Sequence, residues 1–402
     1  MEAAVDGKQH PSEAELAVQF NEFCTTWGHP TEASILENLN ALKDKNIQYY
    51  VIDAGWYTNE HGWEKSHGDW QVNQEQFPNG LKSVVDTIKK NQMIPGIWFE
   101  IETVGSESIA SSFLEHLLEK DGYPLTVGSR RFWDMRDPWV KNYLGEKVIR
   151  FLKENEIGYL KIDYNENFGI GFDGEESLGE ACRQQVEASQ DFIREIQSQL
   201  PDLIIENCSS GGHRLEHSMM ELTDLSSFSD AHEAVCIPIV AANLHHLMSP
   251  RQSLIWAVFR KQDSLQRLYY SMTGTFLGRM CLSGDINELS STQWQVIDDC
   301  MTFYEEAKPL IKQGKTKIFR DEVLSYGEPN GCQIVLRFHQ KKALIVIHNF
   351  DQDEIELPFE LKKITKTCGI ETQNILLKET SGKCRIAFSN GFMGCSLLVD
   401  LV

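Results

Sequence analysis

Short runs of β-branched and aromatic residues alternate with stretches of helical period between about residue 20 and residue 313. This alternation is typical of βα units around a parallel sheet. Eight runs predict strands: Phe20–Trp27, Tyr49–Ala54, Ile94–Glu100, Gly158–Tyr164, Leu203–Cys208, Leu225–Asp230, Ser253–Ala257 and Gly278–Asp285. Eight such strands predict an α/β fold, a (β/α)8 TIM barrel, over residues 1–314.

The pattern changes after Lys315, where strand-like runs follow one another without helices. These runs are Cys332–Phe338, Ala343–Phe350 and Ser396–Val402. Turn-forming residues separate them, so residues 315–402 are predicted to form a small antiparallel β domain. Three of the barrel helices are predicted over Glu32–Lys45, Leu81–Asn91 and Gln293–Lys312, with Thr31, Asn79 and Ser290 as N-caps.

Composition narrows the class of protein. The 402 residues include 59 Asp and Glu against 38 Lys and Arg, a net charge of −21 that repels nucleic acid and anionic membranes. The N-terminus is polar and the apolar runs are too short to span a bilayer, which favours a cytoplasmic protein. Ten cysteines are spread singly without a C-x-x-C pair, so free thiols are expected and a zinc site is not.

Residues that follow the strands of such a barrel face its catalytic mouth. Here they are Trp27, Asp53, Trp56, Trp98, Glu100, Glu102, Lys161, Asp163, Glu206, Asn207, Cys208, Ser229, Asp230, His232, Ser283 and Asp285. Carboxylates, a lysine and tryptophans exceed what ordinary turns need, and they suit a sugar, whose hydroxyls bind acids and whose apolar faces pack on aromatic rings.

Asp163 and Asp230 are the candidate pair of acids that glycoside hydrolysis requires. Lys161 lies two residues before Asp163, so strand alternation directs it to the same side, where its charge keeps Asp163 ionised. The alternative is structural: these acids, or Glu206 with Asp230, cap adjacent helices.

Seven ordered segments carry a resemblance. They are Tyr50–Trp56, His67–Leu81, Gly96–Glu102, Tyr159–Asn165, Glu206–Arg214, Phe228–Asp230 and Met272–Asp285. In order and spacing they resemble the α-galactosidases of glycoside hydrolase family 36, the melibiase group, and the likeness continues into the β domain.

The resemblance implies a retaining exo-glycosidase that hydrolyses terminal α-galactosyl linkages of small α-galactosides. Asp163 matches the nucleophile and Asp230 the general acid/base. The implied substrate-binding residues are Asp53, Trp56, Trp98, Lys161, Cys208, Gly211 and Arg214, with Trp70 as a further pocket aromatic. No cofactor or metal is implied, the partner is a small carbohydrate, and a homo-oligomer is expected by analogy.

The chain also departs from the family pattern. Ala54 replaces a second aspartate that accepts sugar hydroxyls, His213 replaces a glycine, and Ile162 and Glu166 replace a tryptophan and an arginine. Only some twenty residues precede the first predicted strand, so the family's large N-terminal β domain is expected to be missing. Ala54 and His213 leave open an α-N-acetylgalactosaminidase or other α-glycosidase, and the missing domain and altered motifs leave open a catalytically silent sugar-binding protein. A transglycosylase of the raffinose-synthase type, which uses the same covalent intermediate, and a metal-dependent hydrolase are further alternatives.

Overall fold

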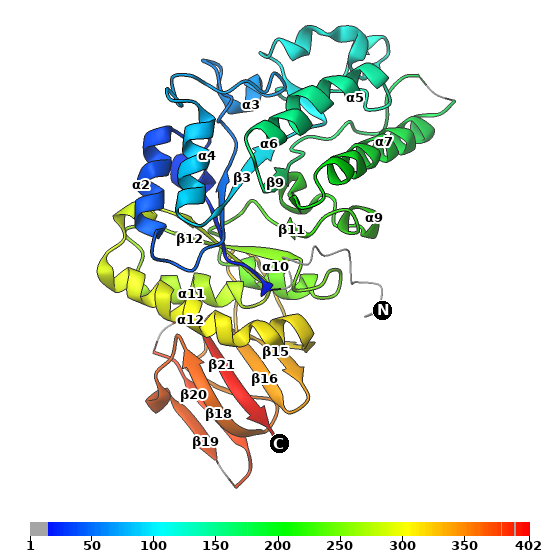
Figure 1. Cartoon of the computed structure of the whole chain (residues 1–402). Helices are drawn as coiled ribbons and strands as arrows, with labels where there is room; N and C mark the ends of the chain where they lie inside the picture. Colours follow the sequence, from blue (N-terminus) through cyan, green and yellow to red (C-terminus); the bar gives the residue numbers. More distant parts are fainter. Residues whose placement is uncertain (1–14, 175, 379, 390) are drawn as a thin grey trace. The chain divides into compact units, whose positions relative to one another are not determined.

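The computed structural model describes residues 15–402 apart from 175, 379 and 390 (Figure 1). Eight parallel strands form a closed barrel in the order β1-β13-β12-β11-β10-β9-β3-β2. They are β1 (Gln19–Asn21), β2 (Tyr49–Ile52), β3 (Ile94–Phe99), β9 (Tyr159–Ile162), β10 (Ile204–Asn207), β11 (Leu225–Ser227), β12 (Ser253–Phe259) and β13 (Arg279–Gly284). The predicted barrel is confirmed, and each predicted strand overlaps an observed one.

The described residues cluster into two compact parts, a first part of residues 19–227 and a second part of residues 15–18 and 228–402. In the first part, neighbouring barrel strands pair in parallel from β1 to β11 through β2, β3, β9 and β10. Lys161 on β9 lies in register with Trp98 on β3 and with Glu206 on β10. The register therefore sets a lysine between an indole and a carboxylate on adjacent strands.

The predicted first strand is too long. Strand β1 ends at Asn21, and a short helix α1 (Phe23–Thr26) follows it. Trp27 ends that helix in the left-handed conformation, with φ of 53°, and is 54% exposed. Trp27 is thus a helix-terminal residue and does not lie at a strand end.

The helices of the first part are α2 (Glu32–Leu42), α3 (Trp63–Ser66), α4 (Leu81–Lys90), α5 (Pro138–Leu144), η5 (Gly145–Ile149), α6 (Arg150–Glu154), α7 (Leu178–Gln199), α8 (Ser209–Gly212) and α9 (His217–Met220). Three of them, α2, α5 and α7, begin at a residue whose side chain caps them, and the others do not. Thr31 caps α2 through a reciprocal bond with Ser34, as predicted. The N-cap of α4 is Gly80, and the prediction of Asn79 is wrong by one residue.

An insertion between β3 and α5 was not predicted. It contains β4 (Thr103–Gly105), η3 (Ala110–Ser112), η4 (Leu114–His116), β5 (Glu119–Lys120), β6 (Tyr123–Pro124), β7 (Thr126–Val127) and β8 (Arg130–Phe132). Strands β4, β8 and β7 form one small antiparallel sheet. This sheet brings Arg130 to the barrel residues described below.

The second part contains the paired strands β12 and β13 and the helices α10 (Ile237–Leu244), α11 (Leu265–Thr275), η6 (Ile286–Glu288) and α12 (Ser291–Gln313). Ser290 and Gln293 cap α12 reciprocally, which confirms Ser290 as the predicted N-cap, although the helix begins two residues before the predicted Gln293.

Antiparallel strands follow α12 (Figure 1). A five-stranded sheet has the order β14 (Lys315–Arg320), β15 (Cys332–His339), β16 (Lys342–Asn349), β21 (Met393–Leu401) and β18 (Leu361–Cys368). A smaller sheet contains β17 (Glu354–Glu356), β20 (Lys383–Ala387) and β19 (Ile375–Lys378), the last preceded by η7 (Thr372–Asn374). The predicted antiparallel strands are confirmed, while β14, β17, β18, β19 and β20 were not singled out.

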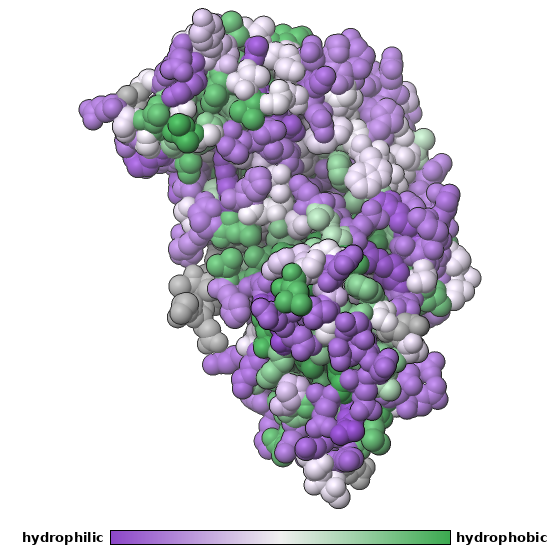
Figure 2. All heavy atoms as spheres, turned by 180° about the vertical axis from the view of Figure 1, so that it is seen from behind, coloured by the Kyte–Doolittle hydropathy of each residue, from purple (hydrophilic) through white to green (hydrophobic). Residues whose placement is uncertain are grey.

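Hydrophilic residues cover most of the face seen in Figure 2, with hydrophobic residues in smaller groups between them. Within the described part of the chain, no helix is both long and apolar enough to cross a membrane.

Candidate active site

Asp163 directly follows β9, and hydrogen bonds hold both of its carboxylate oxygens. Oδ2 accepts from the indole Nε1 of Trp98 at 3.1 Å and from Nδ2 of Asn165 at 2.9 Å. Oδ1 accepts from the backbone N–H groups of Tyr164 at 2.8 Å and Ser210 at 2.7 Å. The side chain therefore has a fixed orientation, and its four donors all favour a negative charge.

Asp163 is buried, yet its surroundings favour the charged form of its carboxyl group. Burial by itself raises the pKa of this carboxyl, but the positive charge of Lys161 and the hydrogen bonds from Ser210, Asn165 and Tyr164 outweigh it. The pKa of Asp163 consequently lies below its usual value, and the group is a carboxylate at neutral pH.

Lys161 and Asp53 form a buried ion pair. Nζ of Lys161 lies 2.8 Å from Oδ2 of Asp53, which also accepts from Nδ2 of Asn21 at 2.6 Å. Burial alone would lower the pKa of Lys161, yet nearby negative charges, led by Asp53, raise it well above its usual value. Oδ1 of Asp53 accepts from the backbone N–H of Ala54 at 2.8 Å. The charged ammonium of Lys161 thus pairs directly with Asp53 and also interacts electrostatically with Asp163.

Glu22 is a member of this cluster that the sequence analysis missed. Its Oε1 accepts from the backbone N–H of Asp53 at 2.9 Å and its Oε2 from Oγ1 of Thr26 at 2.5 Å. Burial is the main cause that raises the pKa of Glu22 to about 8. Its position directly after β1 is the signal that could have identified it as a site residue. The predicted strand, which was too long, included this position and so concealed the signal.

Glu206 lies inside the barrel and caps no helix. Its carboxylate accepts from the hydroxyl of Tyr159 at 2.5 Å, from Oγ of Ser227, and from Nε2 of Gln19 at 3.5 Å. Burial is the main reason that its pKa is raised. The structure corrects the alternative in which Glu206 was a helix cap.

Glu100 supports Asp163 indirectly. It pairs with Arg130, whose Nε and Nη2 donate at 2.8 and 3.1 Å, and it accepts from Oγ1 of Thr103 at 2.6 Å. Nδ2 of Asn165 bonds both Glu100 at 2.9 Å and Asp163. Arg130, which the sequence analysis did not single out, therefore acts on Asp163 through Glu100 and Asn165.

A left-handed turn presents the backbone N–H that binds Asp163. Ser209, Ser210 and Gly211 have φ values of 47°, 54° and 65°. The turn starts at buried Cys208, whose N–H donates to the carbonyl of Ile162 at 2.8 Å. Gly211 lets the chain complete this turn without the penalty of a Cβ atom.

The guanidinium group of Arg214 contacts a carboxylate and an aromatic ring. Its guanidinium donates to both carboxylate oxygens of Glu102 and lies 3.8 Å from the ring centre of Tyr164. Ser189 also donates to Glu102, at 2.8 Å. His213, next to Arg214, is exposed.

The predicted aromatic residues differ in position. Trp98 touches Asp163, whereas Trp56 is fully buried and donates its Nε1 to the carbonyl of Trp98 at 3.0 Å. Trp56 also stacks on Trp70, with ring centres 6.0 Å apart. Trp56 and Trp70 thus pack against each other and next to Trp98, and the prediction that they line a sugar pocket stays a prediction.

Asp230 belongs to the second part of the chain, just after β11. Its side chain is 50% exposed, and Nε2 of His232 lies 4.0 Å from its Oδ1. The pairing of Asp230 with Asp163 stays a prediction.

A hollow of about 660 Å³ opens beside Asn165 within the first part. The segments after β2, β3 and β9 line it, with the residues Trp63, Lys65, Ser106, Arg130, Asn165 and Glu166. Its size is that of sites for small organic ligands.

His245 is partly buried, where its Nε2 donates to the carbonyl of Leu277 at 2.6 Å and its Nδ1 lies 3.1 Å from Oγ1 of Thr316. Among residues 15–402, with the three gaps given above, no group of three or more His, Cys, Asp or Glu side chains is arranged to hold a metal ion.

Residues 8–314 match the family model of melibiase. The chain belongs to the melibiase family. This membership confirms the resemblance that the seven sequence segments predicted.

Curated relatives of this melibiase-family chain are α-galactosidases by name. Alpha-galactosidase 1 of Pediococcus pentosaceus is 23% identical over 384 residues, which cover 92% of this chain and 51% of that protein. The bifunctional alpha-galactosidase/sucrose kinase AgaSK of Mediterraneibacter gnavus is 26% identical over 375 residues, covering 88% of this chain and 37% of that protein. The chain thus spans about half the length, or less, of these relatives.

Solved structures share the melibiase-family fold. A variant of GH36 α-galactosidase AgaA from Geobacillus stearothermophilus, in complex with 1-deoxygalactonojirimycin, gives a TM-score of 0.80 at 20% identity. The match covers 98% of this chain and 57% of that one. Another AgaA variant in complex with raffinose gives 0.79 over the same shares.

Proposed function

We propose that this protein hydrolyses terminal α-galactosyl linkages of small α-galactosides, with retention of configuration at the anomeric carbon. The observation that carries the proposal is Asp163, an ionised carboxylate held by four donors beside the Lys161–Asp53 pair. Membership of the melibiase family and relatives named α-galactosidases support it.

Asp163 is the proposed nucleophile. Its carboxylate attacks the anomeric carbon as the bond to the leaving oxygen breaks, which forms a covalent glycosyl-enzyme. The low pKa keeps the attacking oxygen charged, and the bonds from Trp98, Asn165 and Ser210 hold it in one direction.

Asp230 is the proposed general acid/base. It protonates the leaving oxygen and then takes a proton from the water that cleaves the glycosyl-enzyme. Retention requires its carboxyl to lie about 5–5.5 Å from that of Asp163. The half-exposed position of its side chain suits exchange of the leaving group for water.

The remaining proposed roles concern the sugar. Asp53 and Lys161 bind hydroxyls through their buried charges, and Trp98 forms the wall beside the nucleophile. Cys208 and Gly211 surround the 2-hydroxyl, and Arg214 closes their segment with Glu102 as its partner. Ala54 removes one acceptor, so specificity rests more heavily on Asp53.

The test is initial-rate hydrolysis of p-nitrophenyl α-galactoside, α-N-acetylgalactosaminide and α-glucoside by the wild type and by Asp163→Asn. Asp191→Asn is the control, because Asp191 is an exposed aspartate on α7 that pairs with Arg194. We expect galactoside hydrolysis that the control keeps and Asp163→Asn loses by on the order of 10³-fold or more. Turnover that survives in Asp163→Asn contradicts the proposed role of Asp163. Hydrolysis of another glycoside but not of the galactoside contradicts the proposed substrate and leaves the proposed mechanism standing.

We also propose a boundary between a barrel domain, residues 1–314, and a C-terminal β domain, residues 315–402. A separate hydrophobic core supports it, since every member from Phe319 to Leu401 comes from the C-terminal strands and their connections. Limited proteolysis that cuts near residue 315 before cutting elsewhere is the expected result.

Two further proposals concern the location of the protein in the cell and its oligomeric state. Ten free cysteines support a cytoplasmic location, because oxidising compartments favour disulfides. A homo-oligomer is proposed by analogy with the family. Cell fractionation and light scattering of the purified chain test the two proposals separately.

A further inference from the structure

Two cysteines meet in the second part of the chain. Sγ of Cys300, on α12, lies 3.4 Å from Sγ of Cys368, the last residue of β18. The two residues are 68 positions apart, so a helix of the barrel and a strand of the C-terminal sheet bring them together. Both thiols are free.

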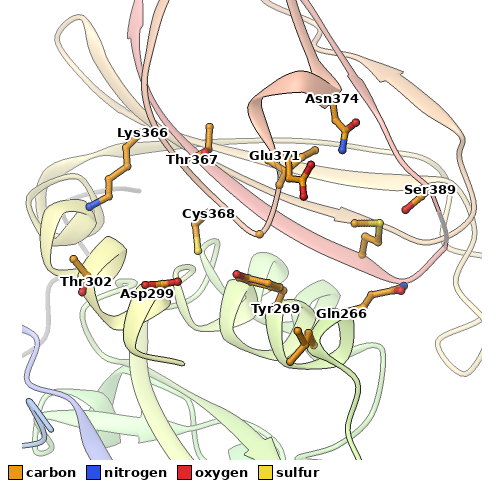
Figure 3. Close-up of a pocket in the computed structure, with 14 residues that line it drawn as sticks. Gln266, Tyr269, Asp299, Thr302, Lys366, Thr367, Cys368, Glu371, Asn374 and Ser389 are labelled. Carbon is orange, nitrogen blue, oxygen red and sulfur yellow. The ribbon is translucent and has the colours of Figure 1, made fainter. Parts of the chain in front are cut away.

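A pocket gives access to one of the two sulfur atoms. Cys368 lines a hollow of about 590 Å³ together with Tyr269 of α11, Asp299 of α12 and Lys366 of β18. Figure 3 shows the Cys368 side chain directed toward Tyr269 and Asp299 at this hollow. Cys368 is 7% exposed, whereas Cys300 behind it has no exposed surface. A small reagent in the pocket therefore reaches Cys368 first.

We propose that Cys300 and Cys368 form an oxidisable dithiol, which a small disulfide reagent entering this pocket converts into a disulfide between α12 and β18. A disulfide needs the two sulfur atoms about 2.0 Å apart, so the 3.4 Å contact closes by a small side-chain movement. The buried thiol of Cys395 interacts with Cys368 as well, but Cys368 is the cysteine that lines the pocket.

The small disulfide reagent is the oxidant in the proposed reaction. The thiolate of Cys368 attacks one sulfur of a low-molecular-weight disulfide, forming a mixed disulfide and releasing one thiolate. Cys300 then loses its proton, attacks the sulfur of Cys368 and releases the second thiol. Two protein thiols are oxidised to one disulfide, and one reagent disulfide is reduced to two thiols.

The second step is expected to be slow at neutral pH. The hydrogen bond with Cys368, followed by burial, raises the pKa of Cys300 well above its usual value. Cys300 thus stays protonated until Cys368 has reacted, and the mixed disulfide accumulates before the cross-link.

The cross-link has a structural consequence. It closes a loop that contains β14 to β18 and ties the C-terminal sheet to α12. Because long closed loops restrict the unfolded chain most, oxidation should raise the Tm of the full chain by roughly 5 °C.

The test treats the native full chain with hydroxyethyl disulfide at pH 8, blocks free thiols with iodoacetamide and maps peptides without reduction. The expected result is a peptide pair linked through Cys300 and Cys368 as the first cross-link, together with the higher Tm. No linked pair, or a first cross-link at other cysteines, overturns the proposal.

Variants test the order of the two steps. Cys300→Ser should trap the mixed disulfide on Cys368, whereas Cys368→Ser should leave Cys300 unmodified. Cys384→Ser is the matched control, since Cys384 is a buried thiol outside the pocket lining, and it should still form the cross-link. Modification of Cys300 in Cys368→Ser contradicts the proposed route. None of these outcomes depends on glycosidase activity.

Discussion

The ammonium nitrogen of Lys161 lies 2.8 Å from Oδ2 of Asp53, with both side chains buried in the barrel. This pair places a positive charge near the buried Asp163, and charges interact strongly at buried positions. It links the proposed binding of sugar hydroxyls to the ionisation of the proposed nucleophile.

Replacing the lysine should therefore shift the pH profile. In Lys161→Met the pKa of Asp163 rises, because the charge that lowers it is gone. A carboxylate with a higher pKa needs a higher pH to ionise, so the acid limb of kcat/KM for p-nitrophenyl α-galactoside should move to higher pH. Lys153→Met, at an exposed contact with Gln199, should leave the limb in place. An unmoved limb in Lys161→Met contradicts the electrostatic link.

Gly211→Ala tests the turn that holds the nucleophile. A Cβ atom at φ of 65° costs about 1–2 kcal/mol and should displace the Ser210 N–H from Asp163. We expect a loss of about tenfold in kcat and a Tm lower by several degrees. Gly179→Ala, on α7 with open space around the added atom, should keep kcat and slightly raise Tm. Full kcat in Gly211→Ala would show that the turn has no part in positioning Asp163.

Glu22 should make stability fall with pH. Its folded-state pKa of about 8 exceeds the ordinary value of 4.5, so the folded protein holds a proton that the unfolded chain releases between these values. The free energy of unfolding should decline across that window. Glu22→Gln keeps an acceptor for the Asp53 N–H and a partner for Thr26, and should flatten the decline. Urea unfolding at pH 5, 7 and 9 measures both slopes, and equal slopes would rule out this role for Glu22.

Two arginines provide a matched comparison of ion pairs. Arg130→Met leaves the fully buried Glu100 without its charged partner and should destabilise the protein by about 3–5 kcal/mol. Arg385→Met removes exposed pairs with Glu354 and Glu356 and should cost less than about 1 kcal/mol. Chemical unfolding of both variants measures the difference. A similar cost for the two would contradict the buried position of the Arg130–Glu100 pair.

Much of the barrel could be predicted because its strands are short apolar runs that leave a periodic signal. All eight overlap observed strands, and Asp53, directly after β2, forms an ion pair with Lys161 on β9. The insertion of residues 103–132 could not be predicted, because its strands of two or three residues carry no such periodicity.

Contacts between residues of distant segments could not be predicted from the sequence either. Arg130 reaches Glu100 across 30 positions, and Glu22 reaches Asp53 across 31, contacts that only the folded chain determines. Trp56 follows a strand like a site residue, yet packing against Trp70 buries it completely. Position after a strand indicated the candidate residues but not which way each side chain points.

The central claim is that Asp163 forms the covalent glycosyl-enzyme. The most direct measurement incubates the native protein with 5-fluoro-α-galactosyl fluoride, which slows hydrolysis of that intermediate, and maps the labelled peptide by mass spectrometry. We predict one fluorogalactosyl group on the peptide that carries Asp163. A label on a different carboxylate, or steady turnover of the galactoside with no label at Asp163, would contradict the account.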